Sequence, residues 1–170
     1  MARTGAREAD EDKTMNAIEL LKQDHVTVKV LLEQLKNTTE RGVKTRTELL
    51  RRIEIELLIH TTIEEQIFYP AFKAAGEKDE SVMWAEAKEE HRTVDSLVLP
   101  DLKQTPPSSL EFAGRAKVLK ELVEHHIEEE EKEMFPKASK LLGKQKLAEL
   151  GAEMEALKKS MKQELQSNAA

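Results

Sequence analysis

Apolar residues recur at alternating gaps of three and four over most of the chain, a spacing that places side chains on one face of an α-helix. The first such segment begins near Asn16, which forms a capping-box pattern with Glu19. It is predicted to end near Asn37, before a turn at Gly42. Its inward-facing row includes one histidine: Ile18, Leu21, His25, Val28, Leu32 and Leu35.

Three more segments show the same spacing, at about residues 45–76, 79–100 and 108–143. The pair Ser108 and Glu111 is a capping-box signature for the last of them. Each segment again has polar residues within its apolar row. The rows are Leu49, Ile53, Leu57, His60, Glu64, Ile67 and Ala71; Trp84, Ala87, His91, Val94 and Val98; and Phe112, Ala116, Leu119, Val123, His126 and Glu130.

Prolines interrupt these segments. Pro70 and Pro136 are predicted to kink the second and fourth helices, because proline lacks an amide hydrogen and its ring crowds the carbonyl four residues back. Pro100 is predicted to end the third helix. Residues 101–108, which include Pro106 and Pro107, should then form the longest loop and lead to the fourth helix.

A fifth segment, at about residues 144–166, has an apolar row without an embedded polar residue: Leu147, Leu150, Met154, Leu157, Met161 and Leu165. We expect it to pack on the other helices or to form a homodimer contact in coiled-coil fashion. No segment shows the alternation of a strand. The prediction is an all-α fold: an up-down-up-down four-helix bundle over residues 15–143 with an additional C-terminal helix. Residues 1–14 are polar and aperiodic, and are expected to form a disordered tail.

The polar residues in the rows form an internal repeat. His25 and His91 are 66 residues apart, and so are His60 and His126 (91 − 25 = 126 − 60 = 66). In each half a glutamate follows the second histidine by four residues, at Glu64 and Glu130. A gap of four puts both side chains on one helix face, one turn apart. Each half therefore directs an imidazole and a carboxylate toward one point.

This repeat favours a metal site over a core of histidines. A single histidine in an apolar row is more often a hydrogen-bonded core residue, and His–Glu pairing across the core would satisfy some of these groups. Such pairing does not explain a set that recurs at a fixed offset, and an unpartnered buried carboxylate is costly. Four imidazoles and two carboxylates without sulfur suit iron, manganese or zinc. Divided by the repeat, they give two histidines for each of two metals and leave both carboxylates free to bridge.

The amino-acid composition excludes several classes of protein function. The chain has 170 residues and a net charge of −6, so it lacks the basic footprint of a nucleic-acid-binding protein. It has no cysteine, which excludes disulfides and thiolate ligands. No apolar run approaches the roughly 20 residues that span a bilayer. The first residues lack the apolar region of a signal peptide, and we expect no membrane partner and a cytoplasmic location.

The spaced residues resemble a known family, the hemerythrin-like (HHE cation-binding) domains. Their hallmark is His … His-x-x-x-Glu, repeated on four antiparallel helices, and the match covers about residues 16–140, with the Glu-Glu pair and the aromatic-Pro pair of each half. The resemblance implies a non-haem di-iron centre with an oxo or hydroxo bridge. It assigns His25 and His60 to one iron and His91 and His126 to the other, with Glu64 and Glu130 as bridges.

The chain departs from the oxygen-carrying members of that family in two ways. They have two histidines four apart on the third helix, whereas Ala87 and Asp95 stand at that spacing from His91. Their fourth helix has His and Asp five apart, a gap that His125 and Glu130 reproduce. His125 is therefore a rival of His126, although the repeat offset favours His126. If His125 is not a ligand, we expect it to be partly exposed or to lie just outside the ring of metal ligands.

Three further residues are candidates for positions around the metals. Glu65 and Glu131 are expected to be solvated or to bond the free nitrogen of a histidine. For Tyr69, packing is favoured over a place beside the metals. The expected ligands are O₂, H₂O₂ or NO, with peroxide-consuming or oxidase turnover as one hypothesis. A sensing or iron-storage module without turnover and a purely structural bundle are the alternatives.

Overall fold

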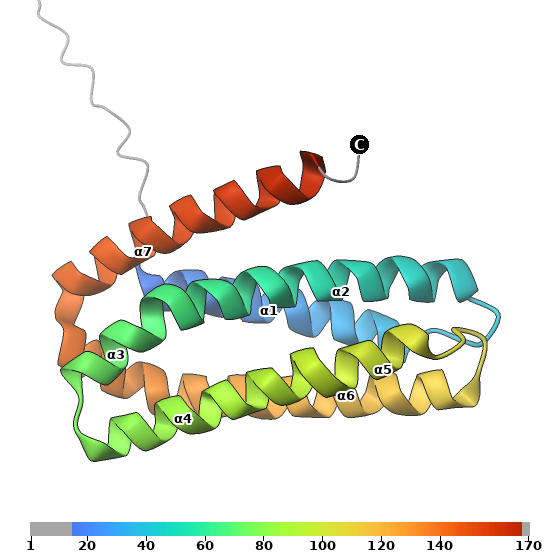
Figure 1. The fold of residues 1–170 in the computed structure, drawn as a ribbon, viewed down its shortest axis with the longest axis horizontal. Coiled ribbons are helices and arrows are strands. Elements are labelled where there is room, and N and C mark those ends of the chain that lie inside the picture. Colours follow the sequence, from blue (N-terminus) through green and yellow to red (C-terminus); the bar gives the residue numbers. More distant parts are fainter. Residues whose placement is uncertain (1–14, 168–170) are drawn as a thin grey trace, which may run out of the picture.

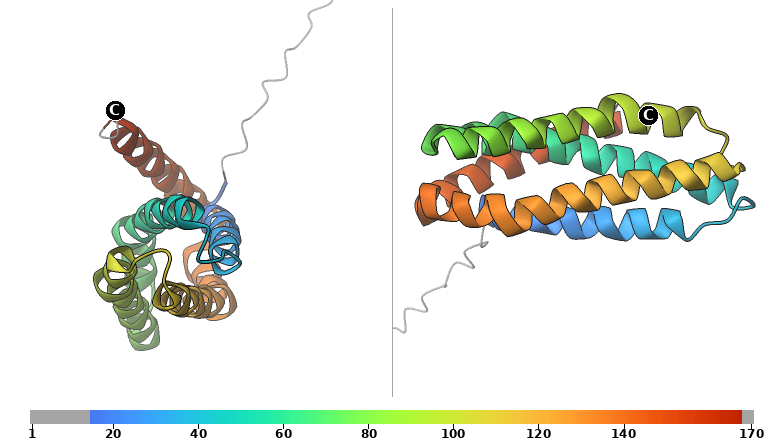
Figure 2. Two further views of the ribbon diagram at one scale, coloured as in Figure 1. Left: turned by 90° about the vertical axis from the view of Figure 1, so that its right-hand side faces the viewer. Right: turned by 90° about the horizontal axis from the view of Figure 1, so that it is seen from below.

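The computed structural model describes residues 15–167, which form helices and connecting turns without a strand. The predicted up-down-up-down bundle with an additional C-terminal helix is confirmed (Figures 1 and 2). The predicted tail, residues 1–14, lies outside the described residues. The four rods of the bundle are α1 (Ala17–Lys36); α2 (Val43–Ile63) with α3 (Tyr69–Ala75); α4 (Lys78–Thr93) with α5 (Leu99–Gln104); and α6 (Leu110–Glu129) with the start of α7 (Phe135–Ser167).

Helix starts follow the capping rules, with one correction. Asn16 and Glu19 form the predicted capping box at α1, with both bonds at 3.1 Å. At α6 the cap is Ser109 rather than the predicted Ser108, because Ser109 Oγ accepts from the amide of Phe112 at 3.1 Å. Either serine satisfies the sequence preference, and only the backbone geometry separates them.

Three rods contain a wide π-helical turn just before a proline. The turns are Glu64–Phe68, Val94–Val98 and Glu130–Met134, and each closes with an amide that donates to a carbonyl five residues back. An extra residue in the turn moves the crowded carbonyl away from the proline ring, so the helix continues. The prediction that Pro100 ends the third helix was therefore wrong, since α5 runs on to Gln104.

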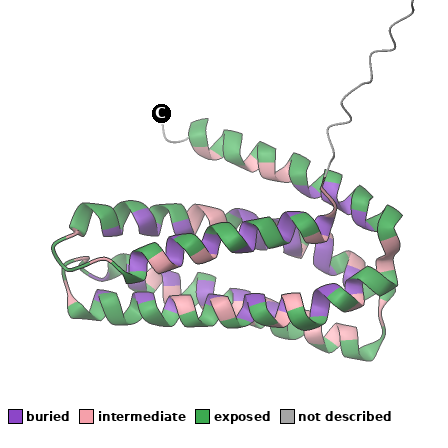
Figure 3. Ribbon diagram, turned by 180° about the vertical axis from the view of Figure 1, so that it is seen from behind, coloured by how far each residue is buried: buried purple, intermediate pink, exposed green. Residues whose placement is uncertain are grey.

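Two apolar clusters fill the bundle, and buried positions line the inner faces of the rods (Figure 3). One cluster lies toward the loop between α1 and α2 and includes Leu32, Ile53 and Leu119. The other lies toward α3 and α7 and includes Phe72 and Phe135. The polar residues of the repeat lie between them.

The C-terminal helix turns back over the bundle. Gly143 has a φ of 72°, a left-handed conformation that bends α7 at the predicted place. Beyond the bend, Leu147, Leu150 and Met154 are buried in the second cluster, and α7 packs against α1 and α2. The first half of the predicted apolar row is thus covered within the chain, and the homodimer contact stays a prediction. The helices of residues 15–167 include none with the length and apolar character that a membrane span requires.

Candidate metal centre

Four rods deliver the repeated residues to one place. α1 provides His25, α2 provides His60, α4 provides His91 and α6 provides His126, while Glu64 and Glu130 are the first residues of two π-helical turns. All six side chains are buried: the most exposed residue, His126, is 7% exposed, and Glu64 is 0% exposed. We call these six residues the His–Glu cluster.

Each carboxylate of the cluster lies between two histidines, one from each half of the repeat. Glu64 has Oε1 at 3.3 Å from Nε2 of His60 and Oε2 at 3.3 Å from Nε2 of His91. Glu130 has Oε2 at 3.2 Å from Nε2 of His25 and at 3.6 Å from Nε2 of His126. This is the placement that bridging carboxylates require.

The donor atoms fall into two groups that share Glu64. One group is His25, His60, Glu64 and Glu130, and the other is Glu64, His91 and His126; within each, the donor atoms lie within 4.8 Å of one another. Four of these atoms make no hydrogen bond despite their burial: Nε2 of His25, Nε2 of His60, Oε1 of Glu64 and Oε2 of Glu130. Buried polar groups without partners are costly. A cation among them would satisfy all four, so the residues fit a metal.

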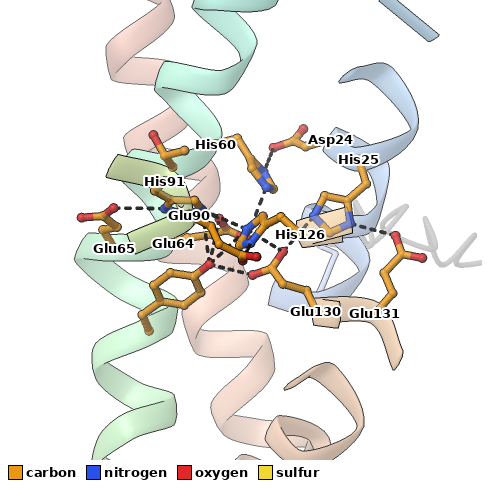
Figure 4. A network of polar contacts seen from close by, with 12 residues as sticks. Asp24, His25, His60, Glu64, Glu65, Glu90, His91, His126, Glu130 and Glu131 are labelled. Atoms are coloured by element: carbon orange, nitrogen blue, oxygen red, sulfur yellow. Dashed lines mark hydrogen bonds and ion pairs between the residues drawn. The ribbon is translucent and has the colours of Figure 1, made fainter. Parts of the chain in front are cut away.

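The other ring nitrogen of every histidine in the cluster faces a carboxylate (Figure 4). Nδ1 of His25 lies 2.8 Å from Glu131, and Nδ1 of His91 lies 3.0 Å from Glu65. Nδ1 of His126 lies 2.6 Å from Glu90. The fourth pair is looser, with 3.7 Å between Nδ1 of His60 and Asp24. A carboxylate at Nδ1 fixes the ring so that Nε2 presents its lone pair to a metal.

The family model of the Hemerythrin HHE cation binding domain matches residues 16–138, the range that holds the whole cluster. The chain belongs to this family. Rv2633c, an uncharacterized protein from Mycobacterium tuberculosis, is 31% identical over 147 residues, which is 84% of either protein.

A solved structure extends the likeness to three dimensions. The crystal structure of the HHE cation binding domain-containing Rv2633c homolog from Mycobacterium kansasii has a TM-score of 0.76 and 32% identity, covering 86% of this chain and 87% of that chain. A DNA nickase from Nostoc sp. is 25% identical over 163 residues. The match takes in 95% of this chain but only 44% of the nickase, so the HHE chain spans less than half of that relative.

Outer residues of this HHE domain were partly foreseen. Glu65 and Glu131 were expected either to be solvated or to bond the free nitrogen of a histidine, and each contacts Nδ1 of a histidine. The roles of Asp24 and Glu90 were missed, although each directly precedes the first histidine of its half. Position in sequence misleads here, because each acid serves the histidine of the next rod rather than its neighbour.

His125 lies apart from the cluster. Its side chain is 63% exposed and faces Glu129 at 3.3 Å, with Glu90 at 4.0 Å. One residue along the helix turns a side chain by about 100°, which is enough to carry His125 to the surface while His126 points inward. The structure therefore brings His126, and not its rival, to the other five residues.

Tyr69 is both packed and polar in its contacts. It is fully buried, and its hydroxyl donates to Oε1 of Glu130 at 2.7 Å. The hydroxyl oxygen of Tyr69 also lies 3.4 Å from Nε2 of His91 and 3.5 Å from Nε2 of His126. Burial and the charges of Glu130 and Glu64 raise the pKa of Tyr69 well above its ordinary value, so the phenol keeps its proton.

The two central carboxyls differ in charge when no cation is bound. Burial and the neighbouring charge of Glu130 raise the pKa of Glu64 well above its ordinary value. Burial also opposes ionisation of Glu130, but His126 and His25 outweigh it and hold the pKa of Glu130 below its ordinary value. The two carboxyls are therefore unequal, with Glu64 the harder of the two to ionise, and a bound cation favours its ionised form.

Proposed function

We propose that the His–Glu cluster binds two iron ions and reacts with O₂ or H₂O₂. The observation that carries the proposal is the pair of donor groups that share Glu64. The group with His25, His60 and Glu130 leaves four buried donor atoms without hydrogen bonds, and the group with His91 and His126 supplies the donors for the second ion. His25 and His60 would hold one ion, His91 and His126 the other, and the two glutamates would bridge. Nitrogen and oxygen donors without sulfur are compatible with iron, manganese or zinc, and the family resemblance favours iron among them.

The bound iron pair supplies redox chemistry toward oxygen and peroxide. Each ion would receive two imidazoles and two carboxylate oxygens, fewer donors than an octahedral ion accepts, so exchangeable positions remain for a small ligand. The third histidine that fills one iron in oxygen carriers is absent, since Ala87 stands at that spacing from His91. We infer that hydrogen peroxide is turned over, with two H₂O₂ giving two H₂O and one O₂, and that no stable O₂ adduct accumulates.

The protein's own groups support that reaction in three ways. The outer carboxylates orient the four imidazoles through Nδ1. The Tyr69 hydroxyl holds a proton beside Glu130 and between two histidines, where it can donate to a substrate oxygen. The two apolar clusters shield the site from bulk water along the bundle axis, on either side of the six residues.

Metal analysis tests the metal part of the proposal. Iron-reconstituted protein is expected to hold two irons per chain. His126→Ala is expected to lose one or both, whereas the matched variant His125→Ala keeps two. One iron per chain, a preference for zinc, or loss in the His125 variant alone would contradict the assignment.

Oxygen evolution from H₂O₂ tests the reaction. The intact protein is expected to exceed both Glu64→Ala and free iron at equal iron concentration. A rate no higher than that of free iron, together with an O₂ adduct stable for hours, would favour an oxygen-binding or sensing module. Full thermal stability without metal would favour the structural bundle. The net charge of −6 gives no support for a DNA substrate like that named for the nickase relative, and we propose none.

A further inference from the structure

A cavity of about 260 Å³ adjoins the histidine side of the cluster. All four histidines line it, whereas Glu64, Glu130 and Tyr69 do not. Apart from buried Thr61 beside His60, its remaining inner wall is apolar and comes from the helical turn next to each histidine: Val28, Leu57, Val94, Val123 and Ile127. A molecule inside it would therefore have imidazoles at one end and aliphatic side chains around its body.

The cavity is larger than O₂ or H₂O₂ requires. One water molecule takes up about 30 Å³ in the liquid, and an apolar cavity of about 150 Å³ binds benzene. A molecule with two oxygen atoms would leave most of the space and the whole aliphatic wall without a partner. The volume instead suits a ligand of about five to ten non-hydrogen atoms.

The cavity opens to the surface between α4 and α6, and its mouth is acidic. The mouth is formed by Glu86, Glu89 and Leu122, which are exposed, with Glu90 and Thr93 just inside. Arg92 pairs with Glu89, but no lysine or arginine of residues 15–167 pairs with Glu86 or Glu90. Negative charge at the opening of a largely apolar cavity disfavours the entry of anions.

We propose that this cavity binds a small, uncharged organic hydroperoxide, with its alkyl group against the aliphatic wall and its O–O end toward the histidines. The binding site itself does not depend on the metal, while its reactive role rests on the function proposed above. In that role the cluster residues would hold two ferrous ions, which would supply the two electrons that, with two protons, reduce ROOH to ROH and H₂O. Anionic hydroperoxides are excluded at the mouth.

Binding is tested with two unreactive probes of the same shape, tert-butanol and the anion pivalate. Saturation-transfer NMR on the purified protein is expected to show tert-butanol binding at least tenfold more tightly than pivalate. Val123→Phe fills the cavity and is expected to weaken tert-butanol binding at least tenfold. Val118→Phe is the matched control, because Val118 is 48% exposed on the same helix and lies outside the cavity lining; this variant is expected to bind normally.

A second variant does not touch the core. Glu86→Lys changes only an exposed mouth residue, and it is expected to bring pivalate within about threefold of tert-butanol. Equal binding of the two probes by the unaltered protein, or unchanged tert-butanol binding in Val123→Phe, would overturn the proposal.

Single-turnover oxidation of the reduced protein separates this proposal from the proposed function. Val123→Phe is expected to slow oxidation by tert-butyl hydroperoxide at least tenfold and oxidation by H₂O₂ less than threefold. Equal slowing by both oxidants would refute a role for the cavity in choosing substrates. If neither oxidant reacts with the unaltered protein while tert-butanol still binds, the proposed function and the reactive role fail, and the cavity remains a neutral-ligand site.

Discussion

Lys158 donates from Nζ to Oδ1 of Asp24, so the additional C-terminal helix contacts the carboxylate that faces His60. Burial alone would raise the pKa of Asp24, but the contacts with His60 and Lys158 hold it below its ordinary value. The helix beyond Gly143 is thus tied to the His–Glu cluster by charge as well as by its apolar row.

Replacing this lysine is expected to destabilise the protein. In Lys158→Met the Asp24 carboxylate keeps its buried place but loses its cation, which costs about 2 kcal/mol in the free energy of unfolding. Denaturant unfolding measures the loss. Lys159→Met is the control, because its side chain is exposed and its effect should stay within about 0.5 kcal/mol. Equal effects of both substitutions would mean that the Lys158 contact contributes nothing specific.

The metal-free protein is expected to lose stability in acid through His60. Burial lowers the pKa of His60 to about 4, against roughly 6.5 in an unfolded chain. Between these values the unfolded chain binds a proton that the folded chain does not, so stability falls as the pH drops from 6.5 to 4. The shift corresponds to about 3 kcal/mol.

The measurement for this prediction is a difference between two proteins. The free energy of unfolding of the chelator-treated protein is compared with that of His60→Asn across the pH range, so that groups present in both cancel. The unaltered protein should lose about 3 kcal/mol relative to the variant between pH 6.5 and pH 4. A constant difference would show that His60 titrates normally in the folded state.

The outer carboxylates are expected to strengthen metal binding without contacting the metal. Glu131→Ala frees Nδ1 of His25 and should weaken iron affinity by about 10–100-fold. Glu128→Ala removes an exposed glutamate from the same run and should leave the affinity unchanged. Competition with a chelator measures both. Matching affinities for the two variants would show that the Glu131 contact is incidental.

Two glycines should respond oppositely to alanine. A Cβ at Gly151 would lie 2.3 Å from the carbonyl oxygen of Met15, so Gly151→Ala forces α7 away from the start of α1 and should cost at least about 2 kcal/mol. Gly114 has open space around it inside α6, and Gly114→Ala should add about 0.5–1 kcal/mol. Thermal unfolding of the two variants measures whether each substitution lowers or raises the stability. A stabilising Gly151→Ala would contradict the close packing of the two helices.

The sequence predicted what local periodicity controls. The gaps of three and four identified the helices, and the gap of four between His60 and Glu64 placed both on the inner face. What it missed depends on contacts between rods. Asp24 lies next to His25 in the chain but faces His60, and no local pattern reveals which rod stands opposite.

Pro100 shows a different limit. Its missing amide hydrogen gave a sound reason to end the helix, and the wide turn at Val94–Val98 removes that reason. The sequence around Pro100 resembles that around Pro70, where the helix was expected to kink and continue. Each proline directly follows a large apolar or aromatic residue, Leu99 or Tyr69. The sequence alone does not say whether a chain breaks at such a point or widens by one residue.

The outer carboxylates also cross between the halves of the repeat. Asp24 and Glu90 each serve a histidine of their own half, while Glu65 serves the second half and Glu131 serves the first. Each half alone would therefore pair its second histidine with an acid of the same half. Its first histidine would have no carboxylate at Nδ1. Two copies of such a half, related by a two-fold axis, would complete each other reciprocally. The crossed contacts within this one polypeptide are those that a symmetric dimer of half-chains would make between its subunits.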